Sequence, residues 1–357
     1  MQSMFREWVS GMDRRDLLKL LGVAAVPPWL DSPNTDDHER LARAVLAPQR
    51  VDAQVIDHID ALVFDAYVAD TRFGPEIALA TVRAQSDLLH AMVDSCPQTL
   101  RPRLLSVLGN AVRICGWLSF NAGDKPSAAS YYERARRLAH QAGDPDLAAF
   151  TLADHAILAI WAKQPRTAVD HSLAADYWVA RGGNPTLKAF VSDMTAVSHA
   201  AAGNGSDALR QFDATGKHLD DLPNATPVPY YNYSHAIHTA RRGQALLSLG
   251  RTSEAVPIIT NSLAMYKTLE RTDKTQVGTA RNLLISELEL SKARAIEGEV
   301  EEAVRIITDA TPRITQLPTP RMGERLQDIL DHLQPWADTP AIRELTNGLR
   351  HQKLIAR

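Results

Sequence analysis

The chain has 357 residues, of which 45% are hydrophobic and 23% are charged, and its formal net charge is −3. This composition is typical of a folded protein with a large core and excludes extensive disorder. Because there is no basic excess, the sequence does not indicate a nucleic-acid or anionic-membrane partner. No apolar run approaches the ~20 residues of a transmembrane helix, so we expect no membrane contact.

Two arginines near the start, Arg14 and Arg15, precede an apolar run at residues 20–26. This order is similar to a twin-arginine export signal. The run is short, two prolines end it and no small-x-small cleavage site follows, so we interpret residues 1–35 as a linker-like segment. An export signal remains the alternative, and a cytoplasmic location is the prediction.

Cysteine usage agrees with a reducing compartment. The chain has two cysteines, Cys96 and Cys115, which make a poor disulfide framework for its length. Both lie in apolar helical surroundings, so we predict buried, reduced thiols. No Cys-x-x-Cys or His-Glu-x-x-His pattern occurs, and we predict neither a metal nor a cofactor.

Helical periodicity begins before any repeat can be recognised. Apolar residues recur with the 3.6-residue period of amphipathic helices in residues 36–46, 51–69, 73–95 and 99–121. We interpret the region 36–108 as N-terminal helices that form a cap and a degenerate repeat.

A short turn pattern then recurs five times. Each copy ends in an alanine and four of the five begin with glycine, as expected where one helix ends and the next begins. The copies span residues 123–128, 163–168, 203–208, 250–255 and 298–303.

Positions outside the turns repeat with them. Small residues stand twelve positions before the turn alanine, at Gly116, Ala156, Ala196, Gly243 and Ser291. Small residues also stand seven positions after it, at Ala135, Ala175, Thr215, Ser262 and Ala310. Mostly large apolar residues stand four positions after it, at Tyr132, Ser172, Phe212, Ile259 and Ile307. Small side chains at fixed offsets let two antiparallel helices approach closely, which predicts stacked helix hairpins.

The turn alanines are 40, 40, 47 and 48 residues apart, against about 34 for an ideal tetratricopeptide unit. The longer intervals include a proline-rich loop at residues 223–229. We therefore predict five repeats over 109–317 and a C-terminal region, 318–357, with capping helices at 321–334 and 339–350. The predicted fold is all-α, a right-handed superhelical solenoid of tetratricopeptide-like helix hairpins.

Several of these segments carry a family resemblance. Residues 116–124, running into 131–135, resemble the hallmark of actinobacterial transcriptional regulators with a helix-turn-helix domain and a tetratricopeptide sensor domain. Residues 229–251, 286–303 and 321–349 look like further blocks of the same family. The resemblance implies a sensor whose inner face holds a signalling peptide, as in the wider group of peptide-responsive bacterial regulators.

The resemblance does not extend to the DNA-binding domain. Twelve residues precede Asp13, too few for the three helices that read a major groove. We expect direct DNA binding only if a further domain is added, either on a separate chain or upstream of Met1.

A ligand is expected on the first helix of each pair, which lines the concave surface of such a solenoid. Counting back from the turn alanines, and adding one tyrosine from the segment described next, the predicted ligand-binding residues are Asn110, Arg113, Trp117, Asn121, Phe150, Ile157, Trp161, Asp193, Tyr231, Gln244 and Lys292. Amides bond a peptide backbone in both directions, and an arginine can hold a carboxylate. Packing between repeats is the alternative role of Trp117 and Trp161.

The richest polar and aromatic segment follows the proline-rich loop and contains Tyr230, Tyr231, Asn232, Tyr233, His235 and His238. His235 and His238 share a helix face, but no third metal ligand is nearby, so we interpret them as solvated or capping residues. The tyrosines either line the groove or hold the loop in place.

No pattern indicates catalysis. The glycines at 182–183 and 203–205 lack the preceding strand and the spacing of a phosphate loop. No serine lies in a nucleophile elbow. We predict a cytoplasmic sensor that binds a peptide or small ligand and contacts a protein partner. The sequence is compatible with an oligomer. The alternatives are a constitutive protein–protein scaffold and a regulator that acts with a separate DNA-binding domain.

Overall fold

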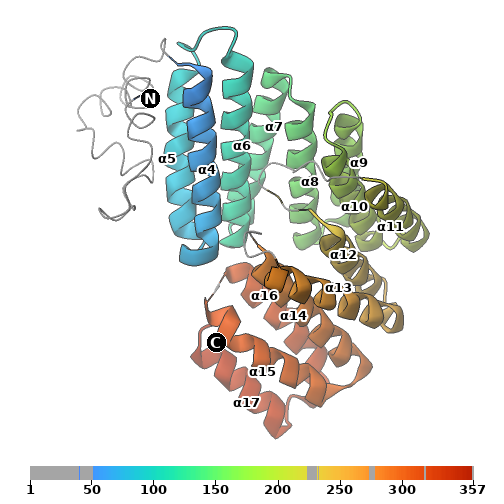
Figure 1. Cartoon of the computed structure of the whole chain (residues 1–357). Coiled ribbons are helices and arrows are strands. Elements are labelled where there is room, and N and C mark those ends of the chain that lie inside the picture. Colours follow the sequence, from blue (N-terminus) through green and yellow to red (C-terminus); the bar gives the residue numbers. More distant parts are fainter. Residues whose placement is uncertain are drawn as a thin grey trace. The chain divides into compact units, whose positions relative to one another are not determined.

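The computed structural model describes residues 40, 51–222, 231, 233–272, 278–316 and 319–355. Within these ranges every regular element is a helix and no strand occurs (Figure 1). The predicted all-α class is therefore confirmed. The helices are α4 (Ala53–Phe73), α5 (Pro75–Met92), α6 (Arg101–Asn121), α7 (Lys125–Ala142), α8 (Pro145–Trp161), α9 (Pro165–Val179), α10 (Pro185–Ala201), α11 (Gly205–Asp220), α12 (His235–Ser248), α13 (Thr252–Thr272), α14 (Thr279–Glu297), α15 (Val300–Gln316), α16 (Pro320–Leu333), the 3-10 helix η3 (Gln334–Trp336) and α17 (Pro340–His351).

The helices expected from periodicity agree with these bounds. The expected ranges 51–69, 73–95 and 99–121 correspond to α4, α5 and α6, and 321–334 and 339–350 correspond to α16 and α17. The segment 1–35, the loop 223–229 and, apart from Arg40, the helix expected at 36–46 lie outside the described residues.

Proline and short polar side chains define where many helices begin. Proline occupies the first turn of α5, α7, α9, α10, α16 and α17, where a missing backbone N–H costs nothing. Side-chain oxygens of Asp124, Asn184 and Thr319 accept hydrogen bonds from backbone N–H groups three residues later, at 3.0, 2.9 and 3.2 Å. These caps satisfy N–H groups that the helix itself leaves unpaired.

The five repeated turns share one geometry. In each turn, the backbone N–H four positions before the alanine donates to the carbonyl nine positions before it, as in Asn204 N to His199 O at 2.9 Å. The residue between the two helices has a positive φ in every copy: Gly123 (82°), Lys163 (58°), Gly203 (81°), Gly250 (71°) and Gly298 (80°). This is the Schellman ending of a helix, which favours glycine because a left-handed backbone crowds a Cβ atom.

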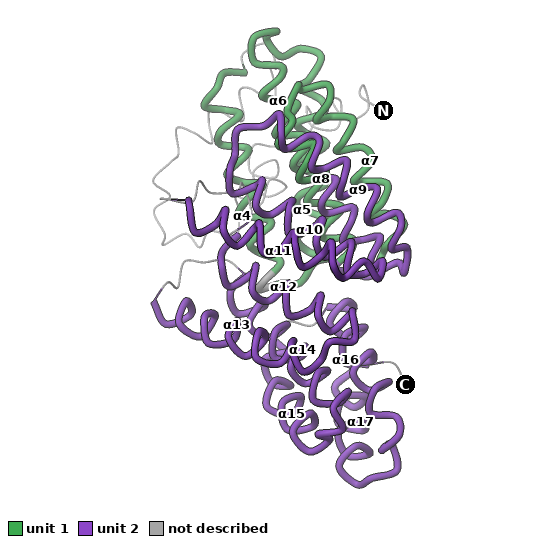
Figure 2. The backbone as a smooth tube through the Cα atoms, turned by 90° about the vertical axis from the view of Figure 1, so that its right-hand side faces the viewer, with its two compact units in different colours: residues 1–120, 124–151 green, residues 121–123, 152–357 purple. Residues whose placement is uncertain are grey.

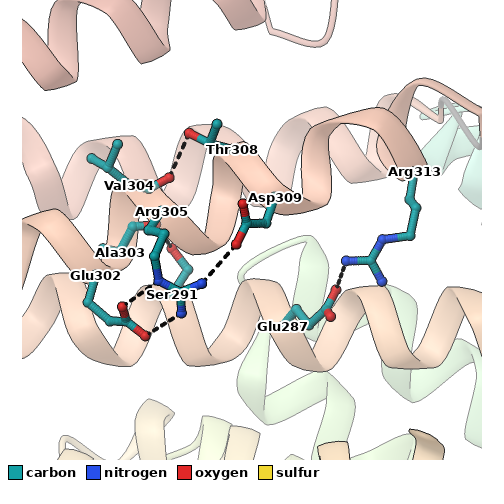
Figure 3. Close-up of polar contacts among 9 residues, drawn as sticks. All are labelled: Glu287, Ser291, Glu302, Ala303, Val304, Arg305, Thr308, Asp309 and Arg313. Atoms are coloured by element: carbon teal, nitrogen blue, oxygen red, sulfur yellow. Dashed lines mark hydrogen bonds and ion pairs between the residues drawn. The ribbon is translucent and has the colours of Figure 1, made fainter.

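Paired helices approach closely at the predicted small residues. A Cβ added to Gly116 would lie 2.7 Å from the Tyr132 ring, and one added to Gly243 would lie 2.5 Å from Ile259. At the matching position in α14, the Ser291 hydroxyl donates to the Ala303 carbonyl at 2.9 Å (Figure 3). The five turn alanines are completely buried. The helix hairpins expected from the spacing are thus confirmed.

The chain forms two compact units, coloured separately in Figure 2. Unit 1 comprises residues 1–120 and 124–151, and unit 2 comprises residues 121–123 and 152–357. In unit 2, the C-terminal core joins apolar residues of α14 to α17, including Leu284, Ile307 and Leu326. Within the described ranges, no helix combines the length and apolar character needed to cross a lipid bilayer.

Replacing Gly243 by alanine tests the close approach of α12 and α13. Because the added methyl group would overlap Ile259, we expect the free energy of unfolding to fall by about 1–3 kcal/mol in urea titrations. Gly348→Ala is the matched control, since that helical glycine has open space around it and alanine favours helix by about 1 kcal/mol. Equal effects of the two changes would contradict the packing account.

Lys163 is the one non-glycine residue among the five positive-φ turn positions. We expect Lys163→Gly to raise the free energy of unfolding by about 1 kcal/mol, because glycine adopts the left-handed region without a Cβ penalty. The reverse change, Gly203→Ala, should lower it by a similar amount. A loss of stability in Lys163→Gly would show that the lysine side chain outweighs the backbone strain.

Candidate functional site

In unit 2 the first helices of successive pairs pack beside one another. Helix α10 packs on α12, α12 on α14, and α14 on α16. Their side chains therefore form a continuous series of contacts, as expected for repeats of this kind. Two polar clusters lie along this series.

The first cluster surrounds Asp193 on α10. Its carboxylate is completely buried and accepts a 2.5 Å hydrogen bond from the Tyr233 hydroxyl. The other carboxylate oxygen lies 2.8 Å from Nδ1 of His238 on α12. A buried charge is tolerated only when it is hydrogen-bonded or paired, and both oxygens meet this requirement. Asp193 thus holds α10 to α12 and to the segment before α12.

Arg241 joins this group to three aromatic rings. Its guanidinium lies 4.7 Å from the ring centroid of Phe190 and 5.7 Å from those of Tyr231 and Tyr233. One terminal nitrogen, Nη2, donates to the Tyr231 hydroxyl at 2.9 Å. The other, Nη1, is buried and has no hydrogen-bond partner among the residues that the structure describes. We call Phe190, Asp193, Tyr231, Tyr233, His238 and Arg241 the Asp193 cluster.

Burial and neighbouring charges set the protonation states of Tyr231, Tyr233 and Arg241. Burial, and then the neighbouring Asp193 charge, raise the pKa of Tyr233 well above its usual value. Burial also raises the pKa of Tyr231, although Arg241 opposes the shift. For Arg241 burial lowers the pKa, but Tyr231 and Asp193 outweigh it and the net shift is upward. At neutral pH both phenols are therefore protonated and the guanidinium is charged.

The second cluster involves α8, α14 and α16. The guanidinium carbons of Arg325 and Arg321 lie 4.9 and 5.9 Å from the ring centroid of Trp161. Arg325 also pairs with Glu289, and Lys292 donates to Asp328 at 2.6 Å. Burial raises the pKa of Asp328, but the Lys292 ammonium outweighs it and the net shift is downward. We call Trp161, Glu289, Lys292, Arg321, Arg325 and Asp328 the Trp161 cluster.

Three of the predicted residues in unit 1 contact one another. The guanidinium of Arg113 lies 3.8 Å from the centroid of the Phe150 ring, and its Nε donates to the Asn110 side chain at 3.0 Å. All three side chains are buried. Trp117 is half-buried and meets Phe120 edge-on, with ring centroids 5.9 Å apart.

The remaining predicted residues lie in unit 2. Asn121 is buried at the end of α6, whereas Ile157 on α8 and Gln244 on α12 are half-buried. The structure thus brings Asp193 and Tyr231 into one cluster, and Trp161 and Lys292 into the other. In both cases residues outside the predicted set join them.

Phe190, Arg241 and the arginines of α16 were not predicted from the sequence. The tyrosine-rich segment signalled the first cluster, but its partners on α10 lie about 40 positions away, and no local pattern identifies them. The interpretation of His238 as solvated or capping was wrong, because the side chain is buried against Asp193. His235 does lie at the surface, with its Nε2 3.1 Å from Oδ1 of Asp220. In the described part of the chain, no three His, Cys, Asp or Glu side chains form a possible metal site.

No protein-family model matches the chain, and no curated sequence matches it. Among solved structures it is similar to a Rap protein complexed with competence and sporulation factor, with a TM-score of 0.53 and 14% sequence identity. The similarity covers 96% of this chain and 88% of the other. This likeness shows a shared helical-repeat fold.

The Asp193 cluster has a measurable role in stability. We expect Asp193→Ala to lower the free energy of unfolding by about 3–5 kcal/mol, because it removes the acceptor that pairs two buried groups. Asp220→Ala breaks an exposed aspartate–histidine pair and should lower the free energy of unfolding by only about 0–1 kcal/mol. Chemical denaturation of both variants at pH 7 measures the difference, and similar effects would contradict the assignment.

Proposed function

We propose that this protein binds a short peptide on the first helices of its repeats, at the Asp193 cluster. The observation that carries the proposal is the buried Nη1 group of Arg241, a charged donor without an acceptor among the described residues. A peptide carbonyl would satisfy it. Asp193 already offsets the arginine charge, so a neutral acceptor suits the site better than a second carboxylate.

The aromatic groups of the cluster support the same ligand class. Phe190, Tyr231 and Tyr233 lie within 5.0–6.3 Å of one another, measured between ring centroids. Peptide-binding sites commonly combine apolar or aromatic walls with a few placed donors. The similar Rap structure is itself a complex with competence and sporulation factor, which supports a ligand-binding role for this fold.

We further propose that the protein acts as a cytoplasmic sensor and not as an enzyme. Peptide binding between α10 and α12 would favour one packing of successive helix pairs over another, and so change the surface offered to a protein partner. The resemblance to regulators with tetratricopeptide sensor domains supports a link to transcription.

A constitutive scaffold is the second candidate. Leu173 and Tyr177 stand four residues apart on α9 and are 50% and 54% exposed. Residues at this spacing share a helix face, so together they present an apolar surface suited to a protein segment. Such a partner would stabilise the chain without any requirement for Arg241.

A screen of synthetic peptide pools by thermal shift tests the peptide proposal. Binding at 100 times the dissociation constant should stabilise the chain by about 2.7 kcal/mol. Arg241→Met should weaken binding of the peptide found by about 10- to 100-fold, as expected for loss of a charge-assisted hydrogen bond. Isothermal titration on the folded variant measures this change.

The matched control is the neighbouring arginine. Arg242 pairs with the exposed Asp213 at 2.6 Å, so Arg242→Met should leave peptide affinity unchanged. If Arg241→Met binds as well as the natural chain, the site lies elsewhere. If no peptide stabilises the protein but a Leu173→Ser/Tyr177→Ser variant loses a protein partner, the scaffold is the better description.

A further inference from the structure

Helix α16 has two different faces. Its apolar residues, Met322, Leu326 and Ile329 among them, belong to the core shared with α14, α15 and α17. Its charged residues Arg321, Arg325 and Asp328 follow one another at i, i+4 and i+7, which places them on a separate stripe. The apolar face packs α16 into the C-terminal repeats. The charged stripe does not contribute to that apolar core, so its role has to come from other contacts.

The charged stripe contacts α8, which is remote in sequence. Arg321 and Trp161 are 160 positions apart, the difference between their numbers. Both arginines of the stripe lie near the Trp161 ring, and Arg321 is buried. A second contact lies beside it, because a Cβ on Gly123 would be 3.2 Å from the Cβ of Pro320. Helix α16 therefore connects the two ends of unit 2.

This connection is of a different kind from the rest of the unit. The C-terminal apolar core contains residues from α14 onwards and none from α8. The contacts of the stripe with α8 include cation–π attraction to Trp161, while the ion pairs to Glu289 and Lys292 orient the stripe from α14. Cation–π contacts are weak compared with a buried core, so opening at such a contact costs less than unfolding the core.

We propose that α16 is an internal clasp: Arg321 and Arg325 cover Trp161 and close unit 2. The clasp masks Trp161 and Lys292, two residues predicted to bind ligand, so an incoming ligand must displace the stripe of α16 to reach them. The inference about masking rests on the proposed peptide function and requires the peptide to extend along the first helices from the Asp193 cluster to the Trp161 cluster, whereas the closure itself does not depend on a peptide. To open the clasp, a ligand would have to bind the open state more tightly than the closed state by at least the free energy of opening.

The first test uses hydroxyl-radical footprinting, with mass spectrometry to resolve each tryptophan. In the full chain carrying Arg321→Gln and Arg325→Gln, oxidation of Trp161 should increase while that of Trp178 and Trp336 stays the same. Trp336 adjoins Gly298 near the C-terminal core, so its increased oxidation would reveal unfolding of α14–α17 instead. Unchanged oxidation of Trp161, or an equal increase at Trp336, overturns the clasp.

Amide hydrogen exchange gives a second, reciprocal readout. The double glutamine variant should increase exchange in the last turn of α8 by about tenfold, and Trp161→Leu should do the same in the first turn of α16. Arg305→Gln is the matched control, because Arg305 pairs with Glu302 and Asp309 on its own helix, α15 (Figure 3). It should leave both segments unchanged, and acceleration there would contradict a specific contact.

The masking inference is tested with the synthetic peptide from the thermal-shift screen. That peptide should bind the double glutamine variant about tenfold more tightly, because the opening cost has been removed. Equal or weaker binding overturns masking while peptide binding stands. If no peptide binds either protein and Trp161 still responds in footprinting, the proposed function fails and the clasp stands.

Discussion

The architecture depends on one steric constraint, the close approach of the two helices in each pair. In two of the pairs a large side chain on the second helix, Tyr132 or Ile259, lies against a glycine on the first helix, which has no Cβ, and the other pairs have alanine or serine at that position. Any larger side chain there would push the pair apart. Because the same offset recurs in both units, the hairpin is the repeated building block, and the lengths of the connections between hairpins vary.

The turns support this constraint from the backbone side. A left-handed residue reverses the chain so sharply that the next helix begins within a few residues. The turn alanine is then completely buried at the base of the hairpin. The sharp reversal brings the second helix against the first directly after the turn, and the small turn alanine leaves room for this packing.

Polar groups occur where successive first helices meet. The carboxylate of Asp193 is hydrogen-bonded to Tyr233 and His238, and the guanidinium of Arg241 packs against aromatic rings. At the other end of unit 2, arginines of α16 lie against Trp161 and are oriented by ion pairs with α14. Contacts of this type are more directional than those of an apolar core, so they favour one arrangement of the helices that they join.

The sequence alone determined the helices, their ends and the hairpin contact, because each of these depends on short spacings that repeat. Ser291 and Ala303, for example, are twelve residues apart, and that offset could be read from five copies. Only the tertiary structure decided that Asp193 meets His238, 45 residues away, or that Trp161 meets α16. The physical reason is that contacts between different hairpins depend on crossing angles and loop lengths that accumulate along the repeats. Local periodicity carries no information about these accumulated angles and lengths. The sequence therefore predicted ligand residues on the first helices but did not predict which residues of other hairpins contact them.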